Sequence, residues 1–233
     1  MAVIQRTTLT PSKLELLASW LPAQSWYLGG RRQPQLTKAG GFRLDDPRGE
    51  VGIEFMTVTD EPGDQPLTYQ VPLSYRGKPL DGADHALIGT AEHGVLGRRW
   101  IYDGTHDPVV VAQLFALILG EAQPQAQSTS NTSDPTVTSY FTETGYPAPI
   151  KLTEVTAGPH GTDLLVRTVA APGRRTRPTR QLTIRLIRIL QPHRGESSAR
   201  TPQALGHVTA GWLLPNGAKA RGLFAVVRDT TPG

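Results

Sequence analysis

Two stretches of the chain carry apolar residues at the spacing of an α-helix. The first covers residues 11–21, where an apolar stripe returns every three or four positions. Two starts fit this helix: Thr10 as its N-cap, or a capping box formed by Ser12 and Glu15. Pro22 ends it. The stripe consists of Leu14, Leu17 and Leu21.

The second helix is predicted from about Pro108 to Leu119. Asp107 is a natural N-cap, Pro108 lacks the N–H that a first helical residue leaves unsatisfied, and Gly120 provides an end. Apolar residues occupy most sides of this helix. We therefore expect it to be buried on more than one face.

Much of the remaining chain alternates apolar and polar residues with the period of a β-strand. In the first half the expected strands are 26–28, 42–44, 51–59, 67–75, 86–89 and 98–102. Further along they are 136–142, 150–156, 163–169, 181–190, 206–214 and 218–227. Asn216-Gly217, between the last two, predicts a hairpin, because a type I′ turn needs positive φ at both central residues.

The composition changes between these two sets of strands. Residues 122–134 are mainly Gln, Ser, Thr, Asn and Pro, which is typical of a linker or a long loop. We therefore divide the chain into a first domain at 1–121, a polar linker at 122–135 and a β-rich domain at 136–233. No amphipathic helix follows to cover the second sheet, so we expect that sheet to fold on itself and also to contact the first half.

Composition narrows the class of protein. The 233 residues are 38% hydrophobic and 19% charged, a globular balance, and the absence of cysteine excludes disulfides, thiolate metal sites and cysteine nucleophiles. The formal net charge is +4, but Lys and Arg are scattered. The one basic run, Arg174, Arg175, Arg177 and Arg180, is interpreted as a solvated loop, so we expect no nucleic-acid partner.

Neither a signal peptide nor a membrane span is visible in the sequence. The start has no charged region followed by an apolar one, and the longest apolar stretch, 109–119, is too short to cross a bilayer. We therefore expect a cytoplasmic protein with no membrane partner.

Five pieces of the first half together resemble the N-terminal cap domain of the maltokinase-like sugar kinases. They are the segment from Leu16 to Tyr27 with the basic turn Gly29-Gly30-Arg31-Arg32, Tyr69 to Leu73, Leu87 to Gly89, Trp100 to Gly104, and Asp107-Pro108. The resemblance covers roughly residues 8 to 120. It implies an α+β fold in which a helix packs on a curved antiparallel sheet. A mostly antiparallel β second half follows in this chain, which is similar to free-standing cap-like proteins of actinobacteria.

The catalytic groups of the full kinases do not stand in this sequence. Such kinases need a Lys for the phosphates, an Asp and Asn in a His-Gly-Asp-like loop and a metal-binding Asp, because phosphoryl transfer depends on positioning and charge neutralisation. His160-Gly161-Thr162 has Thr where the catalytic Asp would stand. We therefore predict that the chain is not an enzyme and has no catalytic residue, cofactor or metal.

Other groups with chemical potential have simpler interpretations. Asp84-His85 and His106-Asp107 could supply metal ligands, but histidines in solvated turns explain them better. Asp45-Asp46 and Asp60-Glu61 stand in turns, where Asp serves the local backbone.

A row of aromatic residues beside two arginines leaves two interpretations open. Trp26 and Tyr27, followed by Arg31 and Arg32, could contact a sugar or a partner, but aromatic residues also build the core of a small domain. We expect Trp20 and Trp26 to be mostly buried.

The resemblance also sets the functional expectation. We expect a non-catalytic accessory or interaction protein linked to maltose and α-glucan metabolism, with a protein partner from that metabolism or a saccharide as ligand. The alternative is a carbohydrate-binding module that uses exposed aromatics.

Overall fold

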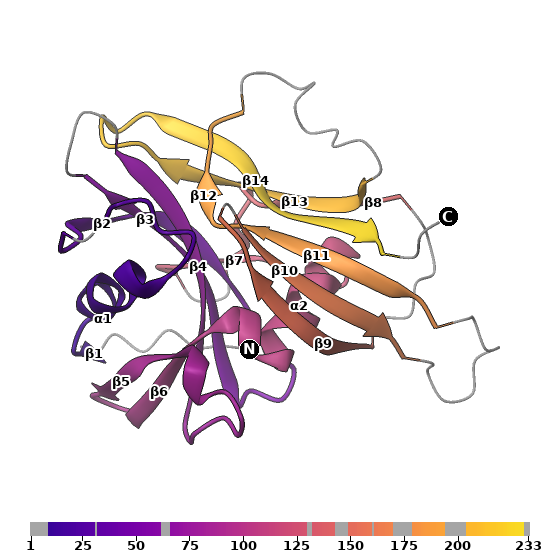
Figure 1. The fold of residues 1–233 in the computed structure, drawn as a ribbon, viewed down its shortest axis with the longest axis horizontal. Coiled ribbons are helices and arrows are strands. Elements are labelled where there is room, and N and C mark those ends of the chain that lie inside the picture. Colours follow the sequence, from indigo (N-terminus) through magenta and orange to yellow (C-terminus); the bar gives the residue numbers. More distant parts are fainter. Residues whose placement is uncertain are drawn as a thin grey trace.

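The computed structural model describes residues 9–30, 32–61, 66–129, 132–142, 149–159, 161–169, 179–193 and 204–230. Figure 1 shows the arrangement of its elements. The helices are α1 (Lys13–Trp20), η1 (Leu21–Ala23), η2 (Asp84–Ala86), η3 (Gly104–His106) and α2 (Pro108–Ile118). The strands up to α2 are β1 (Leu9–Thr10), β2 (Leu36–Leu44), β3 (Val51–Asp60), β4 (Leu67–Arg76), β5 (Leu87–His93) and β6 (Gly97–Asp103). The later ones are β7 (Gln125–Ala126), β8 (Thr138–Phe141), β9 (Ile150–Ala157), β10 (Gly161–Thr168), β11 (Gln181–Ile187), β12 (Ile189–Leu190), β13 (Ala204–Leu213) and β14 (Lys219–Asp229).

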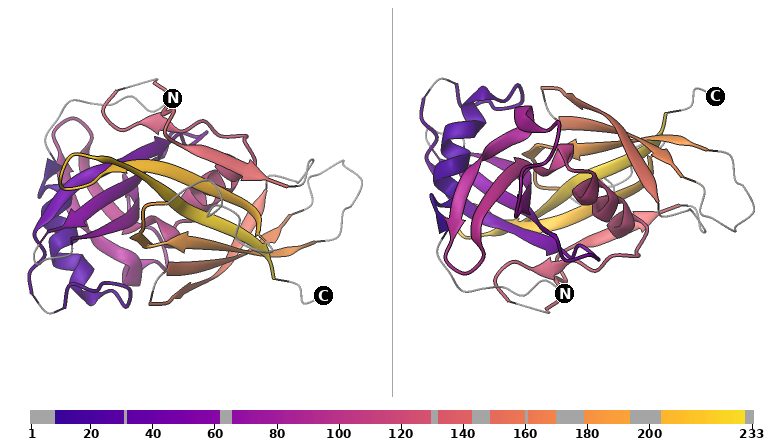
Figure 2. Two further views of the ribbon diagram at one scale, coloured as in Figure 1. Left: turned by 90° about the horizontal axis from the view of Figure 1, so that it is seen from above. Right: turned by 90° about the horizontal axis from the view of Figure 1, so that it is seen from below.

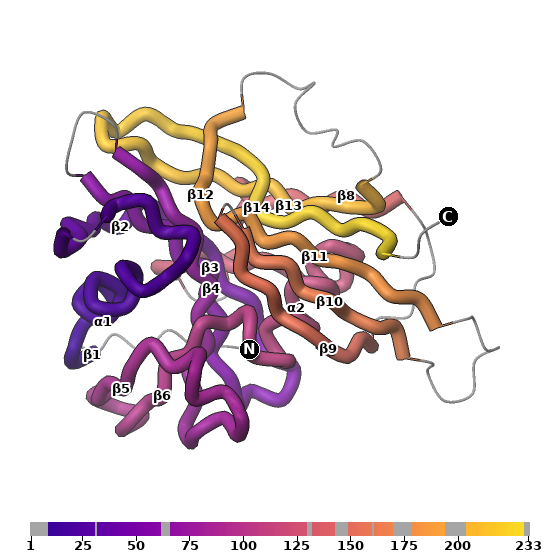
Figure 3. Tube along the Cα trace, viewed as in Figure 1, coloured from indigo at the N-terminus to yellow at the C-terminus, as the bar shows by residue number. Residues whose placement is uncertain are grey.

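One antiparallel sheet runs through both halves of the chain. Its strands follow the order β1-β5-β6-β4-β3-β2-β13-β14-β11-β10-β9, while β7, β8 and β12 pair off this path. The junction between the halves is the pairing of β2 with β13, where Gly40 stands opposite Trp212. In Figures 1 and 3 the first half lies on the left and the second half extends across the top and right.

The sheet also returns to its own first half. β12 directly follows β11 and pairs with β4, with Ile189 opposite Tyr69. The Gln70 side-chain amide donates to the carbonyl oxygens of Ile187 and Phe224, at 2.9 and 3.0 Å. The strands β2, β3, β4, β11–β12, β14 and β13 therefore form a closed ring of pairings.

Strand β3 is buried on both faces, and its two faces enter two different cores. Val51, Ile53 and Phe55 belong to a large core shared with α2, which we call the α2 core. Met56 and Val58 point to the opposite face and join a core with α1, the α1 core. The alternation of a strand sends successive side chains to opposite faces, so one strand holds both layers together.

Helix α2 lies against the inner surface of the sheet. In Figure 2 (right) this helix is seen in front of β13 and β14. Its N-cap is Asp107, whose side chain accepts from the Val109 N–H at 3.0 Å, and Gly120 follows with a φ of 75°. The predicted helix and its burial on several faces are confirmed. Its buried residues are Val110, Val111, Leu114, Phe115, Leu117 and Ile118.

The predicted fold class is wrong. An α+β fold, with a helix packed on a curved antiparallel sheet and followed by a mostly antiparallel β second half, does not describe a chain in which strands dominate and one sheet runs through both halves. Helix α1 does pack on the sheet, but its 8 residues cover only part of one face. The physical reason for the difference is that β2 and β13 leave backbone groups free to pair with each other, so the two sets of strands join.

Local predictions have mixed outcomes. The capping box of Ser12 and Glu15, the second of the two starts, begins α1. The expected strand 26–28 is wrong, because these residues form a turn and an extended segment without strand pairing. The six strands expected after residue 135 are all present, within a few residues of their predicted bounds.

The polar segment predicted as a linker makes specific contacts with β2. Ala126 pairs with Phe42, and the Arg43 Nε donates to the Ala126 carbonyl oxygen at 3.2 Å. The α2 core contains side chains from the chain before this segment and from the chain after it. The division into domains at 1–121 and 136–233 stays a prediction. In the described part of the chain, neither α-helix is long enough to cross a membrane.

Candidate ligand pocket

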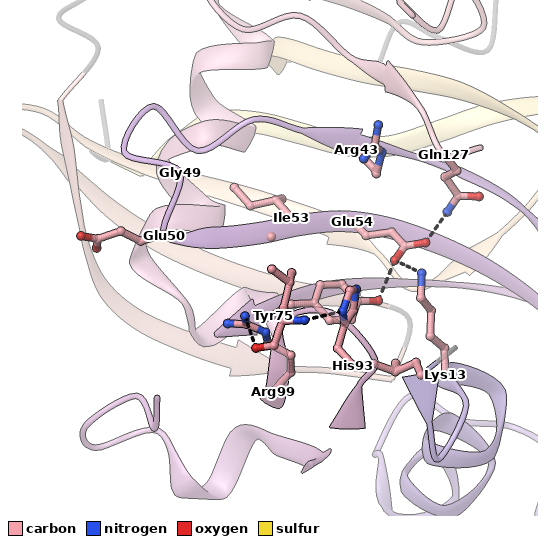
Figure 4. Close-up of a pocket in the computed structure, with 13 residues that line it drawn as sticks. Lys13, Arg43, Gly49, Glu50, Ile53, Glu54, Tyr75, His93, Arg99 and Gln127 are labelled. Carbon is pink, nitrogen blue, oxygen red and sulfur yellow. Dashed lines mark hydrogen bonds and ion pairs between the residues drawn. The ribbon is translucent and has the colours of Figure 1, made fainter. Parts of the chain in front are cut away.

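A buried carboxylate, Glu54, stands at the centre of a polar cluster in the first half. It lies on the same face of β3 as Met56, and only 4% of it is exposed. Three donors surround it, as Figure 4 shows: Lys13 Nζ at 2.6 Å, the Tyr75 hydroxyl at 2.6 Å and Gln127 Nε2 at 2.9 Å. These donors come from α1, β4 and the segment after β7, so the site joins three distant parts of the sequence.

The surroundings of Glu54 decide its charge. Burial raises the pKa of its carboxyl, but the Lys13 ammonium and the hydrogen bonds from Lys13 and Tyr75 together outweigh burial, so the pKa lies below its usual value. Burial, followed by the charge of Glu54, raises the pKa of Tyr75 well above its usual value. At neutral pH, Glu54 is therefore ionised and Tyr75 remains a donor.

Glu54 and its donors line a pocket of about 360 Å³. This volume falls within the roughly 300–1,000 Å³ of small-molecule sites. Leu9, Ile53 and Leu96 contribute apolar surface, while Arg43 and Arg99 add two guanidinium groups. Figure 4 shows Arg43 on β2, Ile53 on β3 and Arg99 on the β5–β6 hairpin around the same cavity.

The predicted contact residues lie elsewhere. Trp26 is 1% and Tyr27 8% exposed, and both belong to the α1 core. The Tyr27 hydroxyl donates to Asp60 at 2.7 Å, and Arg32 forms an ion pair with the same carboxylate at 3.0 Å. Arg31 lies outside the described residues. A sugar or partner contact by these four residues stays a prediction, but the rings of Trp26 and Tyr27 are covered in this structure.

The other groups weighed in the sequence have structural roles. Asp46 accepts from three backbone N–H groups of its turn, as expected of a turn Asp. Asp60 instead forms the buried network with Tyr27 and Arg32, which the turn interpretation did not include. His160 lies outside the described residues, as do Arg174, Arg175 and Arg177 of the basic run.

Two histidines from the first half meet in a second cavity. His85 Nε2 and His106 Nδ1 are 3.0 Å apart, although the residues are separated by 21 positions. This cavity, with a volume of about 340 Å³, also borders Glu154 of β9. Asp107 is paired with Arg76 at 2.7 Å and is not available there. Among the described residues, no three His, Cys, Asp or Glu side chains form a group that could hold a metal ion.

The sequence pattern missed the pocket around Glu54. Lys13, Glu54 and Gln127 are 41 and 73 residues apart, and no short motif links them. One signal was present: Glu54 interrupts a strand face that continues with Met56 and Val58. A carboxylate on such a face predicts a buried partner, because an unpaired buried charge is costly.

One known domain covers the chain from the Trp-rich segment through the strands β2 to β6 to Asp107, the N-cap of α2. Residues 20–107 match the maltokinase N-terminal cap domain. We call residues 20–107 the cap region. It is shorter at both ends than the range 8–120 that the resemblance predicts. It includes Arg43, Glu54, Tyr75 and Arg99 but neither Lys13 nor Gln127, so the pocket combines the cap region with its flanks. No curated protein sequence matches the chain.

Proposed function

We propose that this protein is a non-catalytic accessory or interaction protein of maltose and α-glucan metabolism. The match of residues 20–107 to the maltokinase cap domain supports the link to that metabolism. The resemblance implies that in full kinases the cap sits on the N-terminal lobe of a catalytic domain. By analogy with that family, a chain that carries this cap region is suited to bind such an enzyme.

The packing of the chain that follows the cap region carries the proposal. α2 and the strands β8 to β14 pack against or pair with cap strands, through β2–β13, β4–β12 and the α2 core. The later half therefore completes the sheet and core of the cap.

Thr162 also supports a non-catalytic role. It follows His160-Gly161, where a His-Gly-Asp-like loop would have Asp, and it is 1% exposed. Its hydroxyl accepts a hydrogen bond from Arg188 Nε at 2.8 Å. The closest sequence to a His-Gly-Asp loop thus has a Thr that binds a buried arginine in place of a carboxylate.

The proposal includes a cytoplasmic location, since the chain has no cysteine to form the disulfides common in secreted domains. The alternative function, a carbohydrate-binding module, needs exposed aromatics. Because Trp26 and Tyr27 are buried, the observations favour the accessory role over that alternative.

The test is affinity capture with the tagged full-length protein from extracts of its native host, followed by mass spectrometry. An unrelated tagged protein of similar net charge serves as the control for non-specific binding. The proposal predicts selective enrichment of a sugar kinase or an α-glucan enzyme. Equal recovery in the control would contradict it. A titration with maltose and maltodextrins, followed by tryptophan fluorescence, tests the carbohydrate-binding alternative separately.

A further inference from the structure

The pocket around Glu54 carries more positive than negative charge. Lys13, Arg43 and Arg99 line it, against the carboxylates of Glu50 and Glu54. Lys13 is committed to Glu54 at 2.6 Å, and Glu50 is exposed to solvent. Within the described residues, neither arginine is paired with a carboxylate, so two guanidinium charges face the cavity without a fixed counter-charge.

Each of these guanidinium groups uses only part of its hydrogen-bonding capacity. Arg43 Nε donates to the Ala126 carbonyl oxygen at 3.2 Å, while its Nη2 is buried without an acceptor. Arg99 Nη2 donates to the Leu96 carbonyl oxygen at 2.6 Å, while its Nε is buried without an acceptor. A buried donor without a partner is costly, and a guanidinium binds carboxylate or phosphate oxygens better than neutral acceptors.

A fourth cation, the exposed Lys38, lies close to this charge but does not line the pocket. Lys38 lies near Glu54 and Lys13, and partial burial lowers the pKa of its ammonium. An anion bound beside these residues would favour the charged form of Lys38. The Glu54 carboxylate opposes an anion only weakly, because Lys13, Tyr75 and Gln127 already satisfy it.

The remaining surface limits the size and shape of a ligand. The volume of about 360 Å³ suits a molecule of a few carbon atoms, and Leu9, Ile53 and Leu96 offer it apolar contact. Gln127 and Tyr75 add polar groups at the Glu54 side.

We propose that this pocket binds a small organic anion, whose carboxylate or phosphate group is recognised by one of two guanidinium groups, Arg43 or Arg99, which Figure 4 shows on different sides of the cavity. Nothing in the accessory role requires this site, so the two proposals stand or fall separately.

Calorimetric titration of the full-length protein tests the site at about 0.15 M salt, where non-specific charge effects are screened. The probes are inorganic phosphate, malate and the matched pair glucose 6-phosphate and glucose. Saturable binding of at least one anion, with no binding of glucose, is expected. Glucose binding as tightly as glucose 6-phosphate, or no binding of any anion, would overturn the proposal.

Three variants locate the site. Of Arg43→Met and Arg99→Met, the one that removes the charge-assisted hydrogen bond to the anion is expected to weaken binding about ten-fold or more. Unchanged binding in both variants would overturn the proposal. Arg98→Met is the matched control: Arg98 lies on the same strand as Arg99, but is exposed and stacks over Trp100 at 5.5 Å. Equal loss in Arg98→Met would show that binding follows net charge alone and would overturn the assignment.

Folding of the variants is checked by thermal melting. If Arg43→Met melts below the parent, Arg43→Lys keeps the positive charge but not the planar fork, and it should bind an anion more weakly than the parent. Amide chemical shifts provide a second readout. Perturbation by the bound anion is expected at Gly49, Gly52 and Gln127, which line the pocket, and shifts confined to other surfaces would contradict the site.

Discussion

The guanidinium of Arg188, which comes from the second half of the chain, lies 4.7 Å from the centre of the Trp26 ring in the first half. It also donates to the carboxylate of Asp103 and to the Thr105 hydroxyl. Arg188 is 1% exposed. A buried arginine needs a counter-charge and partners, and here the first half supplies both the counter-charge and the ring.

Loss of Arg188 should destabilise the whole protein. Arg188→Met leaves Asp103 buried without its counter-charge, and we expect a cost of about 3–5 kcal/mol in the free energy of unfolding. The double variant Arg188→Met/Asp103→Asn should recover part of this loss, because it removes both charges. Urea denaturation measures both variants.

The control is Arg180→Met, which removes a partly exposed partner of Asp229 and should cost about 1 kcal/mol or less. If Arg188→Met were as mild as this control, the contact between the halves would not stabilise the fold.

Trp26 should contribute more to stability than Trp20. Trp26 is fully buried in the α1 core, whereas Trp20 is only partly buried beside it, with ring centres 5.8 Å apart. Trp26→Ala should cost about 3–5 kcal/mol, as large core truncations do, and Trp20→Ala less. Thermal unfolding of the two variants makes the comparison, and the reverse order would contradict this description of the α1 core.

The different outcomes for these two residues show what the sequence could predict. The helix, its capping box and the burial of Trp26 follow from local patterns, and so does the β13–β14 hairpin around Asn216-Gly217. The hairpin connection spans residues 214–218, however, with a hydrogen bond from the Leu214 N–H to the Ala218 carbonyl oxygen, and so is longer than a two-residue turn. The exposure of Trp20 depends on how much of α1 the sheet covers, which local pattern does not set.

The features that the sequence did not predict depend on pairing between distant segments. Nothing in β2 or β13 alone specifies that Gly40 will face Trp212, and the fold class was wrong for that reason. The pocket was missed in the same way, since Lys13, Glu54 and Gln127 meet only after α1, β3 and the segment after β7 have packed. The resemblance to the cap family, by contrast, depends on local segments and agrees with the matched residues 20–107.

Stability should fall in acid through Glu54. Its pKa is lower in the folded protein than its ordinary value of 4.5, so its ionised form stabilises the fold above that pH. This contribution is lost as the pH falls below about 4.5 towards the folded-state pKa. Glu54→Gln should lower the free energy of unfolding at pH 7 by about 1–3 kcal/mol and flatten its acid dependence.

Chemical denaturation from pH 7 down to pH 3 measures that slope. Glu92→Gln is the control, because Glu92 is an exposed carboxylate for which little change is expected. An acid dependence of Glu54→Gln as steep as that of the parent would show that another group controls acid stability.

The purified protein should not transfer phosphate from ATP to maltose or glucose. The sequence lacks the Lys, Asp and Asn series of the kinases, and the Thr162 hydroxyl accepts a hydrogen bond from Arg188. A coupled assay for ADP release, with a known sugar kinase as positive control, measures this activity. Turnover that co-purifies with the protein through several columns and increases with its concentration would show that the non-catalytic assignment is wrong.

The central claim is that this cap-like protein acts by binding an enzyme of maltose or α-glucan metabolism. The most direct measurement is a titration of the immobilised full-length protein with each purified sugar kinase and α-glucan enzyme of its host, read by biolayer interferometry. The account predicts saturable binding to at least one of them, which the Arg188→Met variant loses in proportion to its unfolded fraction. Saturable binding to none of these enzymes, by protein shown to be folded, would contradict the claim.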